Sequence, residues 1–434
     1  MLRFRHFAVL LLAGVLLFSA ACAELEEFDP ADIATIEMDT AEEETVSSPE
    51  LSQDVFTPSY GSPWTEDQGS SFWTTPMDIT NEEAVWKMLM EPITVVDRGK
   101  VKGYTASQLT KLNIYMYREP DTSSKIVGEI TNLSQGVRVI KHLDNGWSLV
   151  ECYSSSFFSK PETKIKAWNI LVSGYVETKY LKQVEPTDQL ALVVDKLAQH
   201  VYVFREGKMI ADLLCSTGLV QWNGKKYQPY NETRSGEFLL INMTGSLDSD
   251  TLKCSYAIRF NAGDEIHEVP HQVDPRDKSK KYNTTEPYLG QKRSHGCIRV
   301  QRQKNPDGIN MEWIYKTVRQ KNLCGKVKIV IWEDWQGRQL PIPDPDMLLY
   351  YNPNKGQYYH SQDHCLCTKK SFTSFPYSQL DEGEFAKLKP CAWCTPARRQ
   401  AEIEAINAVY APGKDHEELL NSLRKDYYDY LAAD

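Results

Sequence analysis

The sequence has no lysine or arginine between residues 24 and 86, although this segment holds seventeen acidic residues. From residue 87 onward the chain contains 47 basic and 42 acidic side chains, so the formal net charge of −10 comes from this one acidic segment. Such a segment, rich in Glu, Asp, Ser, Thr and Pro, buries too little apolar surface to offset its conformational entropy. We therefore predict an acidic, disordered tether over residues 24–86.

Nucleotide-binding glycine fingerprints, phosphate loops and repeats of fixed period are also absent from the sequence. It has no stripe of lysine and arginine with interleaved aromatic residues, and no apolar run after residue 23 is long enough to cross a bilayer. These absences argue against a nucleotide cofactor, a nucleic-acid partner and a transmembrane segment in the processed chain. The length of 434 residues predicts two or three domains.

Residues 1–23 contain the longest apolar run of the chain. Two arginines precede the uncharged stretch 7–18, and small residues follow it. This order is typical of a secretory signal peptide, which is too short to span a bilayer as a stable helix. We expect cleavage after Ala23 and release outside the cell, and retention of Cys22 as a lipid anchor is the alternative.

Short apolar runs alternate with turn signals over residues 104–186. Val137 and Val139 follow the period of two that marks a half-buried strand, and Asp144-Asn145-Gly146 marks a tight hairpin. Three motifs occur in the order typical of the bacterial Src-homology-three-like domain: Tyr117-Arg118-x-Pro120, Asn145-Gly146-Trp147 and Gly174-Tyr175-Val176. The segment resembles that family, which implies a small β-barrel that recruits an enzyme to cell-wall peptide. A barrel that serves only as a spacer is the alternative.

A second β-rich region extends over residues 189–333. Its patterns predict a hairpin around Arg205-Glu206-Gly207 and strands in GEFLLINM, CSYAIRFNAG and DEIHEV. One amphipathic helix in INMEWIYKTVRQKN and a last strand in VKIVIW follow. We therefore expect a mainly β fold with one main helix.

The segment SHGCIR, residues 294–299, places a cysteine among polar and cationic groups. A cysteine attacks as its thiolate, and an unassisted thiol with a pKa of about 8.5 is mostly protonated at neutral pH. His295 and Arg299 supply positive charge, and an extended backbone would direct Cys297 and Arg299 to the same face. Gly296 allows close approach of a substrate and oxyanion contacts by nearby amides. Signal removal leaves nine cysteines, and this odd number also favours one thiol with its own task.

The thiol also needs a proton acceptor, and a histidine two residues away on the same strand need not reach its sulfur. His267 ends the strand-like run YAIRFNAGDEIHEV, whereas His271 follows Pro270 in a loop. Both histidines are candidates for the general base on this reasoning.

These features resemble the L,D-transpeptidase catalytic domain of bacterial cell-wall enzymes over residues 189–333. The matching motifs are SHGCIR, the Ile-His pair that ends at His267, Ser216-Thr217-Gly218 and Thr233-x-Ser235-Gly236-x-Phe238. The resemblance implies that Cys297 is the nucleophile, His267 the general base, His295 an orienting neighbour and Gly296 part of the oxyanion site. Ser294, Tyr256 and Arg299 are the candidates for substrate binding, and by the resemblance Arg299 is either structural or substrate-facing.

The resemblance also implies the reaction. The cysteine would attack the carbonyl after the third residue of a tetrapeptide stem in peptidoglycan, expel D-alanine and pass the acyl group to an amine of another stem. Water as acceptor would make the protein a carboxypeptidase, and carbapenems would acylate the same thiol. No cofactor is implied for catalysis, and the expected location is the cell wall or the extracellular face. A sortase-like protein transpeptidase and a non-catalytic wall-binding protein with a relic fold are the alternatives.

Three positions depart from the family pattern. Glu268 follows His267 where a Gly or Ser is usual, and Arg234 stands where a proline is usual. The 26 residues between His267 and Ser294 exceed the usual gap, and the extra stretch reads VDPRDKSKKYNTTEPY. This insert forms either a lid over the donor site or a surface loop.

A Pro-rich link after Trp335 leads to a cysteine cluster, which we expect to form a small α+β module over residues 349–396. Cys391 and Cys394 make a C-x-x-C pair. Four residues compete to complete a metal site with this pair: His360, His364, Cys365 and Cys367. The segment resembles an Ada-type zinc-binding module, which implies one structural zinc held by His360, Cys365, Cys391 and Cys394. Two disulfides are the alternative outside the cell.

The remaining four cysteines lie on or beside predicted strands, where we expect buried thiols: Cys152, Cys215, Cys254 and Cys324. The last residues, 397–434, form a predicted helical tail with one interruption at Pro412-Gly413. The complete expectation is a mainly β chain with a small barrel, a catalytic domain and a cysteine-rich module.

Overall fold

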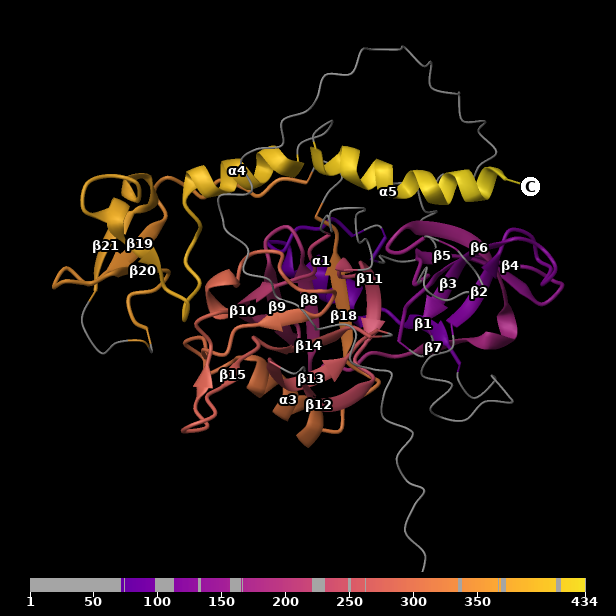
Figure 1. Ribbon diagram of the computed structural model, residues 1–434, viewed down its shortest axis with the longest axis horizontal. Helices are drawn as coiled ribbons and strands as arrows, with labels where there is room; N and C mark the ends of the chain where they lie inside the picture. The colour runs from indigo at the N-terminus through magenta and orange to yellow at the C-terminus, as the bar shows by residue number, and fades with distance from the viewer. Residues whose placement is uncertain are drawn as a thin grey trace, which may run out of the picture.

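The computed structural model describes residues 72–73, 75–97, 113–131, 134–156, 165, 167–220, 231–248, 251–261, 263–334, 338–365, 367, 372–410 and 415–433. The signal peptide expected over residues 1–23 and most of the tether expected over residues 24–86 lie outside these ranges. The described part is mainly β. An N-terminal unit and a cysteine-rich module lie on opposite sides of a central sheet (Figure 1).

The N-terminal unit is an antiparallel sheet with the strand order β3-β2-β6-β5-β4. Its strands are β2 (Asn113–Tyr117), β3 (Ile126–Thr131), β4 (Arg138–His142), β5 (Trp147–Tyr153) and β6 (Leu171–Glu177). The hairpin expected at Asp144-Asn145-Gly146 joins β4 to β5, and Gly146 has a φ of 85°. A 3-10 turn (Thr178–Tyr180) leads to β7 (Leu181–Val184), which pairs with β1 (Ile93–Val96). The likeness to the Src-homology-three-like domain stays a prediction.

The central sheet has nine strands in the order β11-β18-β8-β9-β10-β17-β14-β13-β12. Its strands are β8 (Ala191–Asp195), β9 (His200–Arg205), β10 (Lys208–Ser216), β11 (Gly236–Leu239), β12 (Asn242–Asp248), β13 (Lys253–Arg259), β14 (Glu265–Glu268), β17 (Ile298–Val300) and β18 (Lys328–Trp332). β18 pairs in parallel with β8, and β14 pairs in parallel with β17. The predicted hairpin between β9 and β10 is confirmed, because Glu206 and Gly207 have the positive φ values, 49° and 87°, that such a turn needs.

Both faces of the central sheet are covered, which explains why its inner strands are almost continuously apolar. Leu192 and Val194 of β8 belong to the core under α3 (Met311–Gln320), whereas Ala191 and Val193 belong to a second core on the opposite face. α3 contacts β13 and β14 and is the main helix predicted for this domain.

Residues 72–90 supply the cover of the second face, so the prediction of a disordered tether up to residue 86 is wrong for its last part. α1 (Glu82–Met90) buries three apolar side chains: Val85, Met88 and Leu89. Phe72 is only 1% exposed in the same core. The acidic composition of the whole segment concealed the helical spacing of apolar residues at its end.

The cysteine-rich module is a four-stranded sheet with the order β21-β19-β20-β22 and its own apolar core. Its elements are β19 (Leu348–Tyr351), β20 (Tyr358–His360), β21 (Thr373–Pro376), β22 (Lys389–Pro390) and two 3-10 turns, Tyr377–Gln379 and Phe385–Lys387. The Arg398 guanidinium donates to the carbonyls of Ala198 and Gly290, at 2.9 and 3.1 Å, and so joins the module to the central domain.

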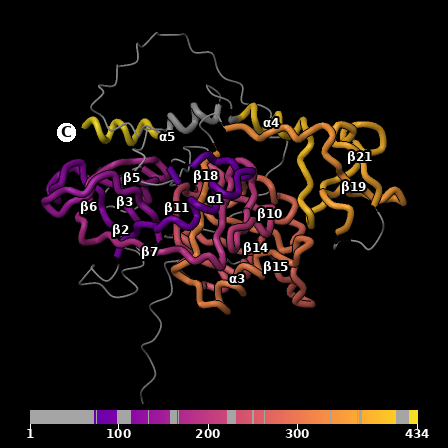
Figure 2. Tube along the Cα trace, turned by 180° about the vertical axis from the view of Figure 1, so that it is seen from behind, coloured from indigo at the N-terminus to yellow at the C-terminus, as the bar shows by residue number. Residues whose placement is uncertain are grey.

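Two helices lie in the range expected for the helical tail, α4 (Gln400–Tyr410) and α5 (Asp415–Ala432). They run along one side of the molecule from the module to the N-terminal unit, in both views (Figures 1 and 2). The Tyr427 hydroxyl donates to the Val127 carbonyl of β3 at 2.7 Å. Tyr427 and Leu431 thereby complete the buried core of the N-terminal unit.

The nine described cysteines are all free thiols. Cys152, Cys215 and Cys254 are buried, as expected, and Cys324 is half-buried. Within the described ranges, no helix combines the length and the apolar character needed to cross a membrane.

Candidate active site

Cys297 lies directly before β17, near the middle of the central sheet. The parallel pairing with β14 sets Ile298 opposite Ile266 and Arg299 opposite His267. Opposed residues of neighbouring strands share one face of a sheet, and side chains two residues apart on a strand also share a face. The register therefore brings the expected nucleophile and the expected base to the same face of adjacent strands.

Ser294 holds the loop around the nucleophile. Its hydroxyl donates to the Cys297 carbonyl and accepts the Gly296 amide at 3.2 Å. Its backbone amide donates to the Thr217 carbonyl at 2.9 Å, and its backbone forms an isolated parallel β-bridge with Gly218, which follows β10. Ser294 is only 2% exposed, and these bonds hold the loop in place. A substrate contact through Ser294 stays a prediction.

Gly296 occupies a position that only glycine fits. Its φ is 121°, and a Cβ added there would lie 2.5 Å from Oδ1 of Asp264. The Thr233 hydroxyl donates to the Gly296 carbonyl at 2.8 Å and accepts the amide of Gly218 at 2.8 Å. The loop before Cys297 therefore passes unusually close to a carboxylate because it has no side chain at this residue.

The imidazole of His267 is neutral in this setting. It is 2% exposed, and desolvation by this burial lowers the pKa of its imidazole to about 4, with the charge of Arg299 acting in the same direction. Its Nδ1 lies 2.7 Å from the Glu268 carbonyl oxygen. A carbonyl only accepts, so Nδ1 carries the hydrogen and Nε2 keeps a lone pair with which to accept a proton.

The Cys297 thiol is protonated at rest. Burial of the sulfur raises its pKa well above the usual range, and the Asp264 carboxylate raises it further, whereas a hydrogen bond from the Glu265 backbone lowers it. The residue nevertheless stays partly exposed. With a raised thiol pKa and a lowered imidazole pKa, both groups are neutral at rest, so the sulfur becomes a nucleophile only when a base takes its proton during attack.

His295 lies in the loop before the nucleophile, and Arg299 lies half-buried on β17. His295 is exposed, and both desolvation and the charge of Arg299 lower the pKa of its ring. Arg299 acts in this way on His267 as well, so its charge lies near both imidazoles. A guanidinium is chemically suited to a substrate carboxylate, and a substrate contact through Arg299 stays a prediction.

His271, the alternative base, has a different setting. Its backbone pairs with Lys253 of β13, and its ring lies 5.2 Å from that of Tyr282. It therefore belongs with the insert, whereas His267 lies on the strand next to β17. This arrangement favours His267 as the base.

The insert between His267 and Ser294 is anchored beside the site. It contains β15 (Gln272–Val273), β16 (Lys280–Lys281) and a 3-10 turn (Glu286–Tyr288). The Tyr282 hydroxyl donates to Oε1 of Glu268 at 2.8 Å, and the Thr285 hydroxyl donates to the Pro270 carbonyl. Glu268, unusual after the histidine, thus serves as the attachment point of the insert.

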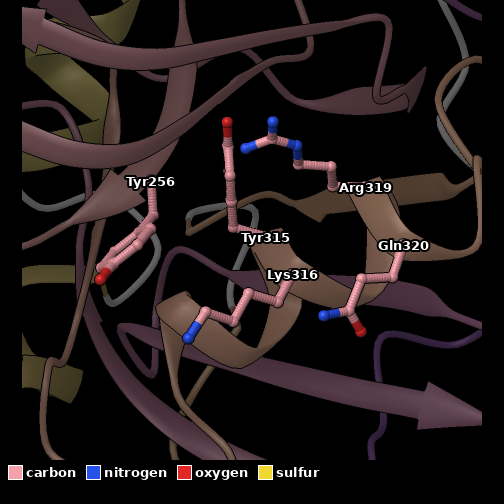
Figure 3. A pocket seen from close by; sticks show the side chains of 5 residues that line it. All are labelled: Tyr256, Tyr315, Lys316, Arg319 and Gln320. Carbon is pink, nitrogen blue, oxygen red and sulfur yellow. The ribbon is translucent and has the colours of Figure 1, made fainter.

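Tyr256 lines a separate hollow beside α3. The hollow has a volume of about 470 Å³, and the side chains of Tyr256, Tyr315, Lys316, Arg319 and Gln320 surround it (Figure 3). The rings of Tyr256 and Tyr315 are 5.7 Å apart. Desolvation and a hydrogen bond with Glu312 raise the pKa of Tyr256 to about 12. A substrate contact through Tyr256 stays a prediction.

Sequence reasoning missed one pair of charged residues near the nucleophile. Arg234, noted only as a replacement for proline, donates from Nη2 to Oδ2 of Asp264 at 2.8 Å and is fully buried. The sequence carries one signal for it, an arginine at a turn where the family has a rigid apolar residue. Asp264 has no signal of its own, because an aspartate before a strand is ordinary in a turn.

The ligands expected in the cysteine-rich module come together. One ligand atom from each of four buried residues lies within 4.8 Å of the others: His360, Cys365, Cys391 and Cys394. His364 is exposed and paired with Asp363, so it takes no part. Cys367 is exposed, and its sulfur lies 3.8 Å from that of Cys391, at the edge of the cluster.

The spacing within this cluster fits a tetrahedral zinc ion. The sulfurs of Cys365 and Cys391 are 3.7 Å apart, and that of Cys394 is 3.4 Å from Nδ1 of His360. Zinc–sulfur bonds of about 2.3 Å imply edges of about 3.8 Å between sulfurs of a tetrahedron. Thiolate and imidazole are also the ligands that structural zinc prefers.

Comparison with known proteins identifies the central domain. Residues 189–331 match the family model YkuD, the L,D-transpeptidase catalytic domain. The chain therefore contains a catalytic domain of this family, as its motifs predict. Among curated proteins, no match to the chain was found.

Similar solved structures include three L,D-transpeptidases at low identity. One from Mycobacterium smegmatis is 13% identical with a TM-score of 0.25, over 56% of this chain and 92% of that one. One from Mycobacterium tuberculosis H37Rv is 15% identical with a TM-score of 0.23, over 46% and 94%. One from Stackebrandtia nassauensis is 20% identical with a TM-score of 0.23, over 36% and 60%.

Proposed function

We propose that the chain is a peptidoglycan L,D-transpeptidase that works through a Cys297 acyl-enzyme. The observation that carries the proposal is the register of β14 and β17, which sets His267, with a free Nε2 lone pair, on the face that holds Cys297. The family match of residues 189–331 supports the same reading.

The reaction follows from the neutral pair. Nε2 of His267 takes the thiol proton as the sulfur attacks the carbonyl after the third residue of a tetrapeptide stem, and amides beside Gly296 receive the oxyanion. The carbon–nitrogen bond breaks, D-alanine leaves with the proton from His267, and a thioester remains. An amine of a second stem then attacks the thioester and passes a proton to His267. The carbon–sulfur bond breaks, and the Cys297 sulfur leaves with this proton from His267. Water in place of the amine gives a carboxypeptidase.

The substrate also defines the expected place of action. Peptidoglycan stems lie outside the cytoplasmic membrane, so we infer that the protein works at the cell wall or the extracellular face after removal of residues 1–23. The N-terminal unit would hold wall peptide near the site, as its resemblance implies.

Carbapenem labelling tests the enzyme proposal. We expect the full chain to gain the mass of one carbapenem, Cys297→Ala to gain none and Cys324→Ala, which removes another half-buried thiol, to behave as the wild type. An unlabelled wild-type protein would support the relic alternative. Labelling without consumption of tetrapeptide stems would favour the sortase-like alternative.

We further propose that His360, Cys365, Cys391 and Cys394 hold one structural zinc ion. All four are buried, their atoms have the spacing of a tetrahedron, and the Trp393 amide donates to the sulfur of Cys391 at 3.5 Å. A metal would give these close thiols a common partner and would fix the end of β20 against the segment after β22.

Metal analysis of protein purified under reducing conditions should find about one zinc per chain. Cys394→Ser should lose the metal, whereas Cys367→Ser, which changes the exposed thiol, should retain it. Absence of zinc in this sample, together with an intact mass lowered by the hydrogens of two disulfides in protein purified without reductant, would establish the alternative.

A further inference from the structure

Arg234 joins the catalytic domain to the N-terminal unit. Its guanidinium carbon lies 4.0 Å from the ring centre of Trp168, a residue of the N-terminal unit, so that the indole stacks on the cation. On the catalytic side, Nη2 and Nε lie 2.8 and 3.3 Å from the same oxygen of Asp264. The arginine is 0% exposed and is therefore sealed between an aromatic face and a carboxylate.

The partner of this arginine lies beside the nucleophile. Arg234 binds Oδ2 of Asp264, and the other oxygen, Oδ1, lies next to Gly296. A Cβ added to Gly296 would lie 2.5 Å from this oxygen. Gly296 directly precedes Cys297, and the negative charge of Asp264 opposes ionisation of the Cys297 thiol and raises its pKa. The charge of Arg234 offsets that of Asp264.

The N-terminal unit also holds the backbone on both sides of Arg234. The Trp168 indole N–H donates to the Glu232 carbonyl at 3.1 Å, and Oδ1 of Asn169 accepts the Ser235 amide at 2.8 Å. Between them, the Thr233 hydroxyl bonds the Gly296 carbonyl. Movement of the loop at Trp168 would therefore move both the guanidinium and the turn that supports the Cys297 loop.

We propose that Arg234 is a positioning residue for Cys297, and that Trp168 of the N-terminal unit holds it where its charge neutralises Asp264 beside the nucleophile. The N-terminal unit is then part of the catalytic machinery in addition to any role in binding the cell wall. The inference rests on the proposed role of Cys297 as the nucleophile.

Other groups also face the thiol and stay constant in the test. Cys254 of β13 and Glu265 of β14 act on the thiol, and His267 of β14 lies opposite Arg299 of β17 on the neighbouring strands. Desolvation lowers the pKa of Arg234, and the carboxylate of Asp264 raises it. Glu129 of β3 is a second carboxylate that raises this pKa. Substitution of Trp168 or Arg234 leaves all of these side chains in place.

The test follows alkylation of Cys297 by chloroacetamide in the full chain across a pH series, with peptide mass spectrometry to resolve each cysteine. A thiol pKa raised by about one unit slows alkylation about tenfold below that pKa. We expect this slowing for Arg234→Gln and, in the same direction, for Trp168→Leu, whereas Trp168→Phe, which keeps an aromatic face, should stay near the wild type. Cys324 in the same sample provides the internal control.

The decisive step is rescue. The double variant Arg234→Gln/Asp264→Asn removes both charges and should restore the pH profile, which a merely structural role of Arg234 would not do. Unchanged profiles in Arg234→Gln and Trp168→Leu, or slowing that Asp264→Asn does not reverse, would overturn the proposal. If circular dichroism shows that Arg234→Gln does not fold, the proposal is tested by comparing the alkylation profiles of Trp168→Leu and Trp168→Phe. Alkylation needs no turnover, so an inactive protein with this alkylation pattern refutes only the proposed function.

Discussion

The low pKa of His267 predicts an acid limb of activity far below that of an ordinary histidine. Desolvation lowers the pKa to about 4 from its usual value of 6.5. Because only the neutral ring accepts the thiol proton, activity is lost as pH falls through the pKa of the folded protein. At pH 5.5 roughly 97% of such a ring is neutral, against roughly 9% of an unshifted one, which amounts to about a tenfold difference in rate.

The assay is the second-order rate of carbapenem acylation as a function of pH, because it reports groups of the free enzyme. We expect a flat rate from about pH 8 to pH 5.5 and a midpoint near pH 4. His267→Gln should lower the rate about 100-fold or more across the whole range, since general base catalysis contributes about 10² to 10⁴. His271→Gln, the matched control, should keep most of the rate.

A midpoint between pH 6 and 7 would refute the reasoning, because it would assign the proton to a ring that is not desolvated. An equal loss in His267→Gln and His271→Gln would refute the assignment of the base. Circular dichroism of both variants distinguishes a lower rate caused by misfolding from a lower rate caused by loss of the general base.

Three further predictions concern other parts of the structure. Gly296→Ala should reduce the rate of carbapenem acylation about 100-fold or more, because the added Cβ displaces the oxyanion amides. Gly146 also has a positive φ but has nothing within 4 Å of an added Cβ, so Gly146→Ala should keep the rate. Equal rates in the two variants would contradict the close contact at Gly296. Lys196 is fully buried among three carboxylates, so Lys196→Met should lower the free energy of unfolding in urea by about 3 to 5 kcal/mol. Lys179 forms an exposed ion pair, so Lys179→Met should leave the urea midpoint unchanged. Equal midpoints in the two variants would count against the buried network. Tyr427→Phe should cost about 1 kcal/mol of stability and speed hydrogen exchange in β3, and unchanged exchange would argue against docking of α5.

Local rules predicted most of the central sheet. Period-two patterning and Gly207, which adopts positive φ freely, located its hairpin at Glu206-Gly207. Cys297 and its loop were also visible, because the nucleophile and its supporting groups lie within six consecutive residues. Information of this kind is local and needs no knowledge of packing.

Other features depend on contacts between distant residues and could not be predicted in this way. The pair of Arg234 and Asp264 joins positions 30 residues apart across the domain, and neither residue type alone indicates a buried ion pair. The choice of His360 over His364 depends on β20 ending at His360 and burying it, since both histidines lie close to the cysteines in the sequence. The tether prediction failed because an average over 63 residues hid the short amphipathic helix α1.

The docking of α5 has a consequence for how the chain folds during synthesis. Tyr427 bonds a strand of the N-terminal unit that precedes it by 300 residues, and Leu431 lies in the same core. Domains generally fold as they leave the ribosome, N-terminal first. Here the first sheet to emerge keeps part of its apolar surface uncovered until the last helix has been made, so synthesis of the C-terminal residues is also the step that closes the earliest core.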